Sequence, residues 1–398
     1  MTFAFGPFHL DEAGRVLRLE NREIALQPRV FNLLVHLVRN RERVVSKEEL
    51  FDTLWPEVTV TEASLQRAIS ILRTALKEGG MENAIRSFPR VGYRFLGKHE
   101  DGVPSVSPHS GNLRQEIKFC AAGDGTRLAY AALGDGPYLV KAANWLSHLE
   151  YEWESPIWTH VFRALSSGRK LVRYDTRGNG LSDWQVNDFS LGAFVSDLEA
   201  VVDASGARRF ALLGISQGCA VSVAYAVRNP ERVSHMVLLG GFARGWCKRG
   251  SPAVESHMAA LETLMRQGWG RSNAAFRQLF TTLLIPDATA EEINAFNELQ
   301  RRTASPENAA RILNAVNLFD VEDLLPQVRV PTLVMHTRYD AVQPFEEGRK
   351  LAAKIPGARF VPLEGRNHLL LSHDPAWKRF SSELNAFIET AAAETRGG

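Results

Sequence analysis

The chain has 398 residues, of which 45% are hydrophobic and 23% charged, and its formal net charge at pH 7 is +2. This length allows two domains, one of about 100 residues and one of about 250 or more, and the composition excludes a fibrous or low-complexity protein. Because no apolar run approaches the roughly 18 residues of a membrane span, and no signal peptide is evident, we expect a cytoplasmic protein without a membrane partner.

The first hundred residues predict a small α+β domain, residues 1–98. Short strands are expected at 3–10, 16–20 and 23–26, helices at 28–39, 46–55 and from about 62 onward, and a closing hairpin of strands 85–88 and 91–96. The third helix carries an apolar stripe that we expect to face the domain core, formed by Leu65, Ile69, Leu72 and Leu76.

The last third of this domain is locally basic. Residues 62–98 contain three acidic residues, Glu62, Glu78 and Glu82, and seven basic ones, Arg67, Arg73, Lys77, Arg86, Arg90, Arg94 and Lys98. A local basic excess on a nearly neutral chain is typical of phosphate contact. For any single arginine, a solvated surface charge is an equally simple explanation.

A linker and a larger domain follow. Residues 99–113 are rich in proline, serine and glycine and show no apolar period, so they are the predicted linker. In residues 114–398, strands are expected at 117–121, 127–132, 138–142, 170–174, 210–213, 236–239, 332–336 and 359–363. Helical patterns separate most of them, which favours a doubly wound, mostly parallel sheet. The helical stretch at about 242–325 interrupts this alternation and is the predicted cap.

A Gly-x-Ser-x-Gly motif lies between a strand and a helix at residues 214–218, which places Ser216 on a sharp turn. Serine is a weak nucleophile at its ordinary pKa and needs a neighbouring base. His368, after the last strand, is the predicted base, and Asp340, after the preceding strand, is expected to orient its ring. The backbone N–H of Gln217 would be one oxyanion donor, and the loop near Asn144 would supply the second.

The first domain resembles the OmpR/PhoB-type winged helix over residues 3–97. The resemblance rests on Leu26–Leu34, Val44–Leu50 with Trp55-Pro56, Ser64-Leu65 with Leu72-Arg73, and Arg90–Phe95. It implies double-stranded DNA as the partner, with the third helix in the major groove. Its expected DNA-contacting residues are Gln66 and Arg67 at base edges, with Ser70, Arg73, Thr74 and Lys77 on the same face and Arg90 and Arg94 in the wing.

The second domain resembles the α/β-hydrolase fold over residues 117–392. Besides the elbow and the order Ser216, Asp340, His368, the turn at residues 174–182 (Tyr-Asp-Thr-Arg-Gly-Asn-Gly-Leu-Ser) matches a family motif. The loop after the third strand reads Ala142-Ala143-Asn144, where active relatives commonly carry His-Gly. That departure leaves the geometry of the second oxyanion donor open, so the triad alone does not establish turnover.

An aromatic-rich loop suggests a pocket for an apolar or aromatic small molecule. Its expected lining residues are Trp145, His148, Tyr151 and Trp246, although core packing explains some of them equally well. No cofactor is expected, and the three scattered cysteines have no metal-ligand spacing, so no metal is expected.

Two functions remain open. The first is a DNA-binding transcriptional regulator, expected to be a homodimer because paired half-sites give a small reader affinity and register, whose hydrolase-like domain binds and could hydrolyse an effector. The alternative is an active serine esterase with an accessory DNA-binding domain. The two are compatible, because hydrolysis could end or generate a signal, and we take the regulator as the primary hypothesis.

Overall fold

A computed structural model describes residues 2–394 except 13, 20, 21, 25, 42, 55–61, 82, 83, 89, 90, 97–114, 251 and 272. The chain separates into two compact units, Met1–Ser110 and Gly111–Gly398, each described here by itself. The predicted linker, residues 99–113, lies outside the described residues.

Among its described residues, the first unit contains two small antiparallel sheets and three helices. Its elements are β1 (Thr2–Phe5), β2 (Phe8–Asp11), β3 (Val16–Leu19), β4 (Arg22–Ile24), α1 (Pro28–Arg39), β5 (Val45–Ser46), α2 (Lys47–Leu54), α3 (Glu62–Lys77), β6 (Ile85–Phe88) and β7 (Gly92–Phe95). The sheets have the strand orders β1-β2-β3-β4 and β5-β7-β6. The single strand predicted at residues 3–10 is wrong: Gly6, at φ +51°, turns the chain and makes a hairpin of β1 and β2.

The core of this unit confirms the predicted apolar face of α3. Leu65, Ile69, Leu72 and Leu76 of α3 are all buried, as is the apolar face of α1. They form one cluster with side chains of β1–β4, the ring of Phe95 and its neighbours. Since four consecutive turns of α3 are anchored this way, the opposite, polar face of the helix is held outward as a rigid surface.

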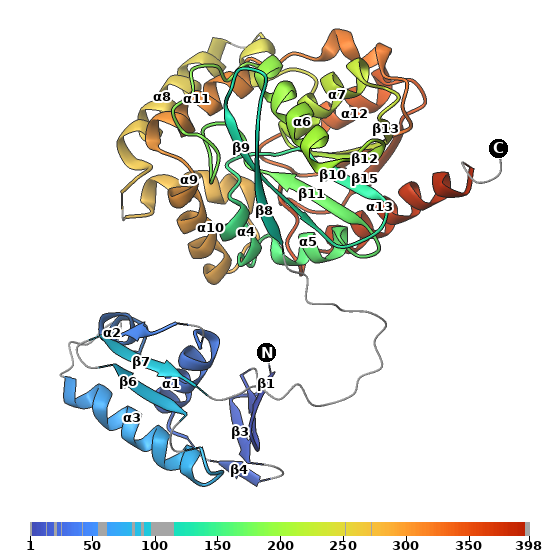
Figure 1. Cartoon of the computed structure of the whole chain (residues 1–398). Helices are drawn as coiled ribbons and strands as arrows, with labels where there is room; N and C mark the ends of the chain where they lie inside the picture. Colours follow the sequence, from blue (N-terminus) through green and yellow to red (C-terminus); the bar gives the residue numbers. More distant parts are fainter. Residues whose placement is uncertain are drawn as a thin grey trace. The chain divides into compact units, whose positions relative to one another are not determined.

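The second unit is built on an eight-stranded sheet (Figure 1). Its strands are β8 (Glu116–Ala121), β9 (Arg127–Leu133), β10 (Tyr138–Lys141), β11 (Lys170–Tyr174), β12 (Phe210–Ile215), β13 (Val233–Leu239), β14 (Thr332–Thr337) and β15 (Arg359–Leu363). The strand order is β15-β14-β13-β12-β10-β11-β9-β8. Strands β10–β15 pair in parallel, and β9 pairs antiparallel with both β8 and β11.

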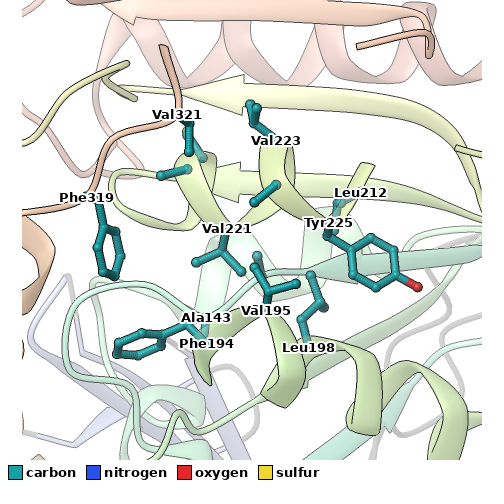
Figure 2. Packing of buried hydrophobic residues seen from close by; sticks show 14 of the residues in the cluster. Ala143, Phe194, Val195, Leu198, Leu212, Val221, Val223, Tyr225, Phe319 and Val321 are labelled. Atoms are coloured by element: carbon teal, nitrogen blue, oxygen red, sulfur yellow. The ribbon is translucent and has the colours of Figure 1, made fainter. Parts of the chain in front are cut away.

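Helices cover both faces of this sheet. They are α4 (Leu149–Trp153), α5 (Thr159–Leu165), α6 (Leu191–Ser205), α7 (Gly218–Arg228), α12 (Phe345–Lys354) and α13 (Pro375–Glu394). The alternation of strand side chains divides the core in two. In β12, for example, Phe210 and Leu212 join the cluster beneath α6 and α7, whereas Ala211 and Leu213 join the one beneath α5 and α13. Figure 2 shows Val195 and Leu198 of α6 packed with Val221 of α7 beside Leu212.

A helical cap is inserted between β13 and β14, as predicted. It comprises η1 (Trp246–Lys248), α8 (Pro252–Gly268), α9 (Ala275–Leu284), α10 (Ala290–Thr303), α11 (Pro306–Asn317) and η2 (Glu322–Gln327). The four long helices gather at one end of the domain in Figure 1, coloured yellow to orange. The cap follows β13 in the chain, so it starts from the carboxyl end of that strand. Ser216 lies at the same edge of the sheet because it follows β12, the parallel neighbour of β13.

No helix among the described residues is long and apolar enough to cross a membrane.

Candidate functional site

The serine elbow is strained in the way that the motif requires. Ser216 has φ +56°, one of three non-glycine residues with positive φ in the described chain. A Cβ at Gly214 would lie 2.8 Å from Cys219 Cα and from Ser222 Oγ, so only glycine fits there. Ser216 N–H donates to Leu239 O at 2.9 Å, which fixes the turn against the end of β13. The elbow therefore presents Ser216 at the carboxyl edge of the sheet, at the start of α7.

Asp340 and His368 form a closely held pair. His368 Nδ1 lies 2.6 Å from Asp340 Oδ2, and Asp340 Oδ1 accepts the N–H groups of Val342 at 2.8 Å and Gln343 at 3.0 Å. Burial raises the pKa of Asp340, but the charge and hydrogen bond of His368 outweigh it, and the net pKa is lowered. An ionised Asp340 fixes the tautomer in which the other ring nitrogen of His368 is free to accept a proton.

That other nitrogen, His368 Nε2, is buried and has no hydrogen-bond partner among the described residues. A Cβ at Gly240, the residue after Leu239, would lie 3.1 Å from His368 Cε1 and 3.7 Å from Asp340 Oδ2. Because Leu239 also holds the Ser216 backbone, the elbow and the His368 ring meet at the end of β13. Asp340 and His368 are thus hydrogen-bonded to each other, and Ser216 lies at the same end of the sheet without a hydrogen bond to His368 among the described residues. The roles of the three residues as a triad stay a prediction.

The cap holds the backbone of the histidine loop. His368 N–H donates to the carbonyl of Leu284, the last residue of α9, at 2.9 Å. Asn367 accepts Asp287 N–H on Oδ1 at 3.0 Å and donates through Nδ2 to Asp374 at 2.9 Å. These bonds make the position of His368 depend on the cap as well as on the sheet.

We call the part of the site around the Asn144 loop, where the second oxyanion donor is predicted, the oxyanion side. It contains a buried lysine. Lys141, at the end of β10, donates to Asn144 Oδ1, and its ammonium lies 5.1 Å from the centre of the Trp158 ring. Burial lowers the pKa of Lys141 to about 8. The loop lies against the elbow, since a Cβ at Gly218 would be 3.1 Å from Ala143 O. The predicted Asn144 loop is therefore next to the elbow, and Lys141 is a contact that sequence reasoning missed.

More buried charge lies nearby. Arg173 pairs with Glu152 at 2.7 Å, with both side chains buried. Burial raises the pKa of Asp175, whose Oδ2 accepts Leu181 N–H at 2.9 Å, to about 7. Buried ionisable groups are thus gathered on the oxyanion side of the site.

A cavity of about 120 Å³ opens beside Ser216. Ser216, Gln217, Asn317 and Gln343 are its polar lining residues, and no ionisable side chain of the described residues lines it. Its apolar wall consists of Trp145, Phe242, Trp246, Met258, Leu261, Phe280, Leu283, Leu284, Leu313, Val316, Ala341 and Val342. Most of these come from the cap helices, where sequence reasoning recognised amphipathic patterns but not which faces point at Ser216.

Of the four predicted pocket residues, Trp145 and Trp246 line this cavity, whereas His148 and Tyr151 do not. The chain turns away at Leu146, at φ +42°, and α4 begins three residues later. His148 accepts Tyr151 N–H at 3.4 Å as the cap of α4, and burial lowers its pKa to about 4. Tyr151 is 37% exposed and lies under the guanidinium of Arg302. Their structural role in α4 corrects the expectation for these two residues.

In the first unit, the predicted DNA-contacting residues of α3 lie on its exposed face. Gln66, Arg67, Ser70, Thr74 and Lys77 are all exposed. Two grooves, of about 710 and 390 Å³, run between α3 and the β6–β7 hairpin, and Ser70 lines both. The geometry is that of a helix beside a wing.

The arginines of this surface differ in their contacts. Arg73 donates to Ile85 O at 2.8 Å and Ser87 Oγ at 2.9 Å, so it joins α3 to β6. Arg94 Nε donates to Arg41 O at 3.0 Å. Arg90 lies outside the described residues. Arg73 and Arg94 thus have structural partners, which the sequence did not reveal, and their DNA contacts stay a prediction.

No group of three or more His, Cys, Asp or Glu side chains that could hold a metal ion occurs among the described residues.

Comparison with known families matches both parts of the chain. Residues 21–95 match the family of the C-terminal domain of transcriptional regulatory proteins, and residues 149–283 match the α/β-hydrolase fold family.

Among curated proteins, the chain is similar to "Putative carbamate hydrolase RutD" of Klebsiella pneumoniae (strain 342), with 27% identity over 218 residues, 53% of this chain and 79% of that protein. The protein of the same description from Rhizobium rhizogenes is 25% identical over 249 residues, 60% of this chain and 89% of its own length. Each aligned region is longer than the first unit, so each similarity involves the second unit.

Solved structures show the same fold. The esterase RhEst1 from Rhodococcus sp. ECU1013 is 25% identical, with a TM-score of 0.59, and the match covers 69% of this chain and 99% of the esterase. The esterase EaEST from Exiguobacterium antarcticum has a TM-score of 0.58 at 23% identity, with coverage of 68% and 98%.

Proposed function

Because this chain joins a transcriptional-regulator DNA-binding domain to an α/β-hydrolase domain, we propose that it is a cytoplasmic transcriptional regulator controlled by a small molecule. The hydrolase domain binds a neutral, apolar or aromatic effector with a carbonyl group. Occupation of the cavity changes the affinity of the first domain for DNA. As a homodimer, the protein would place two copies of α3 on paired half-sites.

The observation that carries this proposal is the apolar cavity beside Ser216. Its volume, about 120 Å³, suits a group of the size of one aromatic ring, because an apolar protein cavity of about 150 Å³ accommodates benzene. The absence of ionisable lining side chains among the described residues disfavours a charged group there, since a buried charge without a partner is costly. The wall is therefore selective for neutral ligands.

The relatives described as carbamate hydrolases act, by that description, on a carbonyl bound to nitrogen. A neutral carbamate or ester with an apolar substituent would place its carbonyl at Ser216 and its substituent against Phe242 and Phe280. Gln217, at the start of α7, would offer one N–H to the carbonyl oxygen.

A second candidate, a working serine hydrolase with an accessory DNA-binding domain, is favoured by the His368–Asp340 distance of 2.6 Å and the strained elbow. Strain at a nucleophile is a common device of catalytic sites. The two candidates differ in whether DNA affinity responds to occupation of the cavity.

The test uses phenylmethylsulfonyl fluoride, a neutral reagent that combines one aromatic ring with a group reactive toward activated serine. Mass spectrometry of the full chain should show one adduct, on Ser216. Ser216→Ala should remove the adduct, and Ser382→Ala, on the exposed side of α13, should keep it. DNA affinity of labelled and unlabelled protein is then compared by fluorescence anisotropy.

A changed DNA affinity on labelling supports the regulator. An adduct without any change in DNA affinity supports the hydrolase with an accessory domain and contradicts the regulator. Failure of the wild-type protein to react, together with no binding of neutral aryl esters by calorimetry, would contradict both.

A further inference from the structure

A second concave surface lies at the opposite edge of the sheet from Ser216. Ser216, Asp340 and His368 all follow carboxyl ends of parallel strands, whereas this groove lies where β10, β12, β13 and β14 begin. Its volume is about 630 Å³, and its floor includes Tyr138, Phe210, Val233 and Pro331. No residue of the groove takes part in the site described above.

Three arginines line this groove. Arg169 precedes β11, Arg209 precedes β12, and Arg329 lies two residues before Pro331 at the start of β14. The only carboxylate among the groove's described lining residues is Glu389 of α13. The groove therefore carries an excess of positive charge.

The three arginines differ in exposure. The side chain of Arg169 is 9% exposed, and its Nη2 lies 3.7 Å from Glu389 Oε1. Arg209 and Arg329 are exposed, and neither forms an ion pair or a side-chain hydrogen bond with any residue that the structure describes. Their charges are available to a partner.

Basic residues continue along the edge outside the groove. Arg208 is exposed beside Arg209, and Lys170 donates to the hydroxyl of Tyr138 at 3.3 Å. Arg232 and Arg359 are already paired, with Asp203 and Glu383. Two exposed carboxylates, Asp135 and Glu231, also lie at this edge. Arg208, Arg209 and Arg329 are thus exposed cations of this edge for which the described residues offer no ion pair.

The spacing of these arginines suits a linear polyanion. Arg329 and Arg209, the exposed arginines of the groove, border strands that are two places apart in the order β14-β13-β12, and neighbouring strands are about 4.8 Å apart, so these two strands are about 10 Å apart. Phosphates of one DNA strand follow each other about every 3.4 Å along the helix axis, so this span corresponds to about three phosphate spacings.

We propose that this groove contacts the phosphate backbone of the DNA that the first domain binds. Arginine suits this role because its planar guanidinium bonds phosphate oxygens in pairs, and the apolar floor holds the methylene stems. DNA is favoured over an acidic protein because the first domain, on the same polypeptide, brings DNA to a high effective concentration near the groove. The proposal rests on the DNA-binding domain and not on the reactivity of Ser216.

The test measures binding of the full chain to a fluorescein-labelled duplex of about 30 base pairs and random sequence as salt is raised. Arg209→Glu with Arg329→Glu should weaken binding at least about tenfold at low salt. Loss of two phosphate contacts should make the slope of log K against log salt shallower by about 1.8. Arg209→Lys with Arg329→Lys should keep most of the slope, because the charges remain.

The matched control reverses two exposed charges in the cap, with Lys248→Glu and Arg271→Glu. This pair changes the net charge equally and should leave the slope close to that of the wild type. Urea unfolding followed by tryptophan fluorescence reports that each variant is folded.

Four results would overturn the proposal. One is an unchanged slope in the variant with both glutamates, and another is an equal change in the cap control, which would reflect net charge alone. The third is loss of binding to a labelled peptide of alternating glutamate and leucine while DNA binding is kept, which would assign the groove to an acidic protein segment. Absence of DNA binding by the wild type would overturn it as well.

Discussion

The two halves of the site around Ser216 are built differently. On the base side, Asp340 has both oxygens bonded, Asn367 uses both ends of its amide, and the ring of His368 is held. On the oxyanion side, buried polar atoms without a partner among the described residues accumulate between residues 144 and 179. These are Asn144 Nδ2, Trp145 Nε1, Ser147 Oγ, Glu152 Oε1, Arg173 Nε, Asp175 Oδ1 and Asn179 Oδ1, and His160 Nδ1 in α5 is a further one in this range.

On the base side, the described residues leave two such atoms, Nε2 of His368 and Nδ1 of His336. The first is the atom that a general base needs free. The hydrogen bonds on the base side therefore hold Asp340 and His368 in place. The oxyanion side contains more buried polar atoms without a partner among the described residues. Preorganised donors are often the largest contribution to acyl transfer, so in the proposed hydrolase the less satisfied half would limit turnover.

The largest expected effect is a loss of ester hydrolysis when the Asp340–His368 pair on the base side is disrupted. Asp340→Asn keeps an acceptor for Val342 and Gln343 but presents an amide to His368 Nδ1, which favours the wrong tautomer. Hydrolysis of neutral aryl esters should fall by about 10⁴-fold in kcat/KM, as for the corresponding change in serine proteases. Binding of the unreacted ester, measured by calorimetry, should not change. A loss of less than about tenfold would mean that Asp340 does not orient the base.

The next effect tests the buried charge of the oxyanion side. Asp175, with a pKa raised to about 7, keeps a proton in the folded protein that the unfolded chain, with a carboxyl pKa near 4, has lost. Its contribution to stability is therefore present at low pH and is lost as the pH rises toward 7. Asp175→Asn removes this dependence.

Relative to wild type, the Asp175→Asn variant should gain up to about 4 kcal/mol in unfolding free energy between about pH 4 and pH 7.5. Chemical denaturation at several pH values measures it. The lowered pKa of His148 acts with the opposite sign between about pH 4 and 6.5, but it is common to both proteins and cancels in the difference. A constant difference between the two proteins across this range would contradict the raised pKa.

A third prediction concerns Asn367 on the base side, whose side-chain amide is hydrogen-bonded at both ends. Asn367→Ala deprives Asp287 N–H of its acceptor and leaves buried Asp374 with Leu371 N–H as its remaining donor, which should cost about 2 kcal/mol in unfolding free energy. Because these bonds link the cap to the histidine loop, kcat should fall as well while KM for a neutral aryl ester changes less. Equal stability of variant and wild type would show that the base side is less constrained than its bonds indicate.

The smallest expected effect on stability comes from Ser147→Ala on the oxyanion side. Ser147→Ala removes a buried hydroxyl that has no partner among the described residues, so the unfolding free energy should change by less than about 1 kcal/mol, with either sign. Chemical denaturation beside the Asn367→Ala variant compares the two halves directly. A loss as large as that of Asn367→Ala would erase the contrast between them.

Local patterns were sufficient for much of the fold. The helix predicted at residues 28–39 and the strands at 170–174 and 359–363 have the predicted bounds, because their apolar periods end at clear polar or turn residues. The elbow was predictable since its constraints are local: a strand, two glycines and a helix. Gly6-Pro7 marks the turn between β1 and β2. The hairpin was nevertheless missed, because the apolar alternation on both sides of this turn resembles that of one continuous strand.

The site was only partly accessible to sequence reasoning. The cavity wall joins Trp145, Phe280 and Leu313, which lie far apart in the chain, and no local period reveals which face of a cap helix points inward. His148 and Tyr151 were chosen because they follow Trp145 closely, but α4 redirects them. Nor does a sequence show that Arg73 folds back onto Ile85 O, because that contact depends on the hairpin.

The left-handed backbone of Ser216, at φ +56°, has a consequence for how such a protein can change over time. Glycine adopts this conformation without penalty, whereas for another residue it costs about 1–3 kcal/mol. Replacement by glycine would remove this strain and leave the cavity wall in place, although the greater freedom of glycine in the unfolded chain offsets part of the gain. Ser216 therefore carries a cost in stability that recognition by the cavity wall alone would not require.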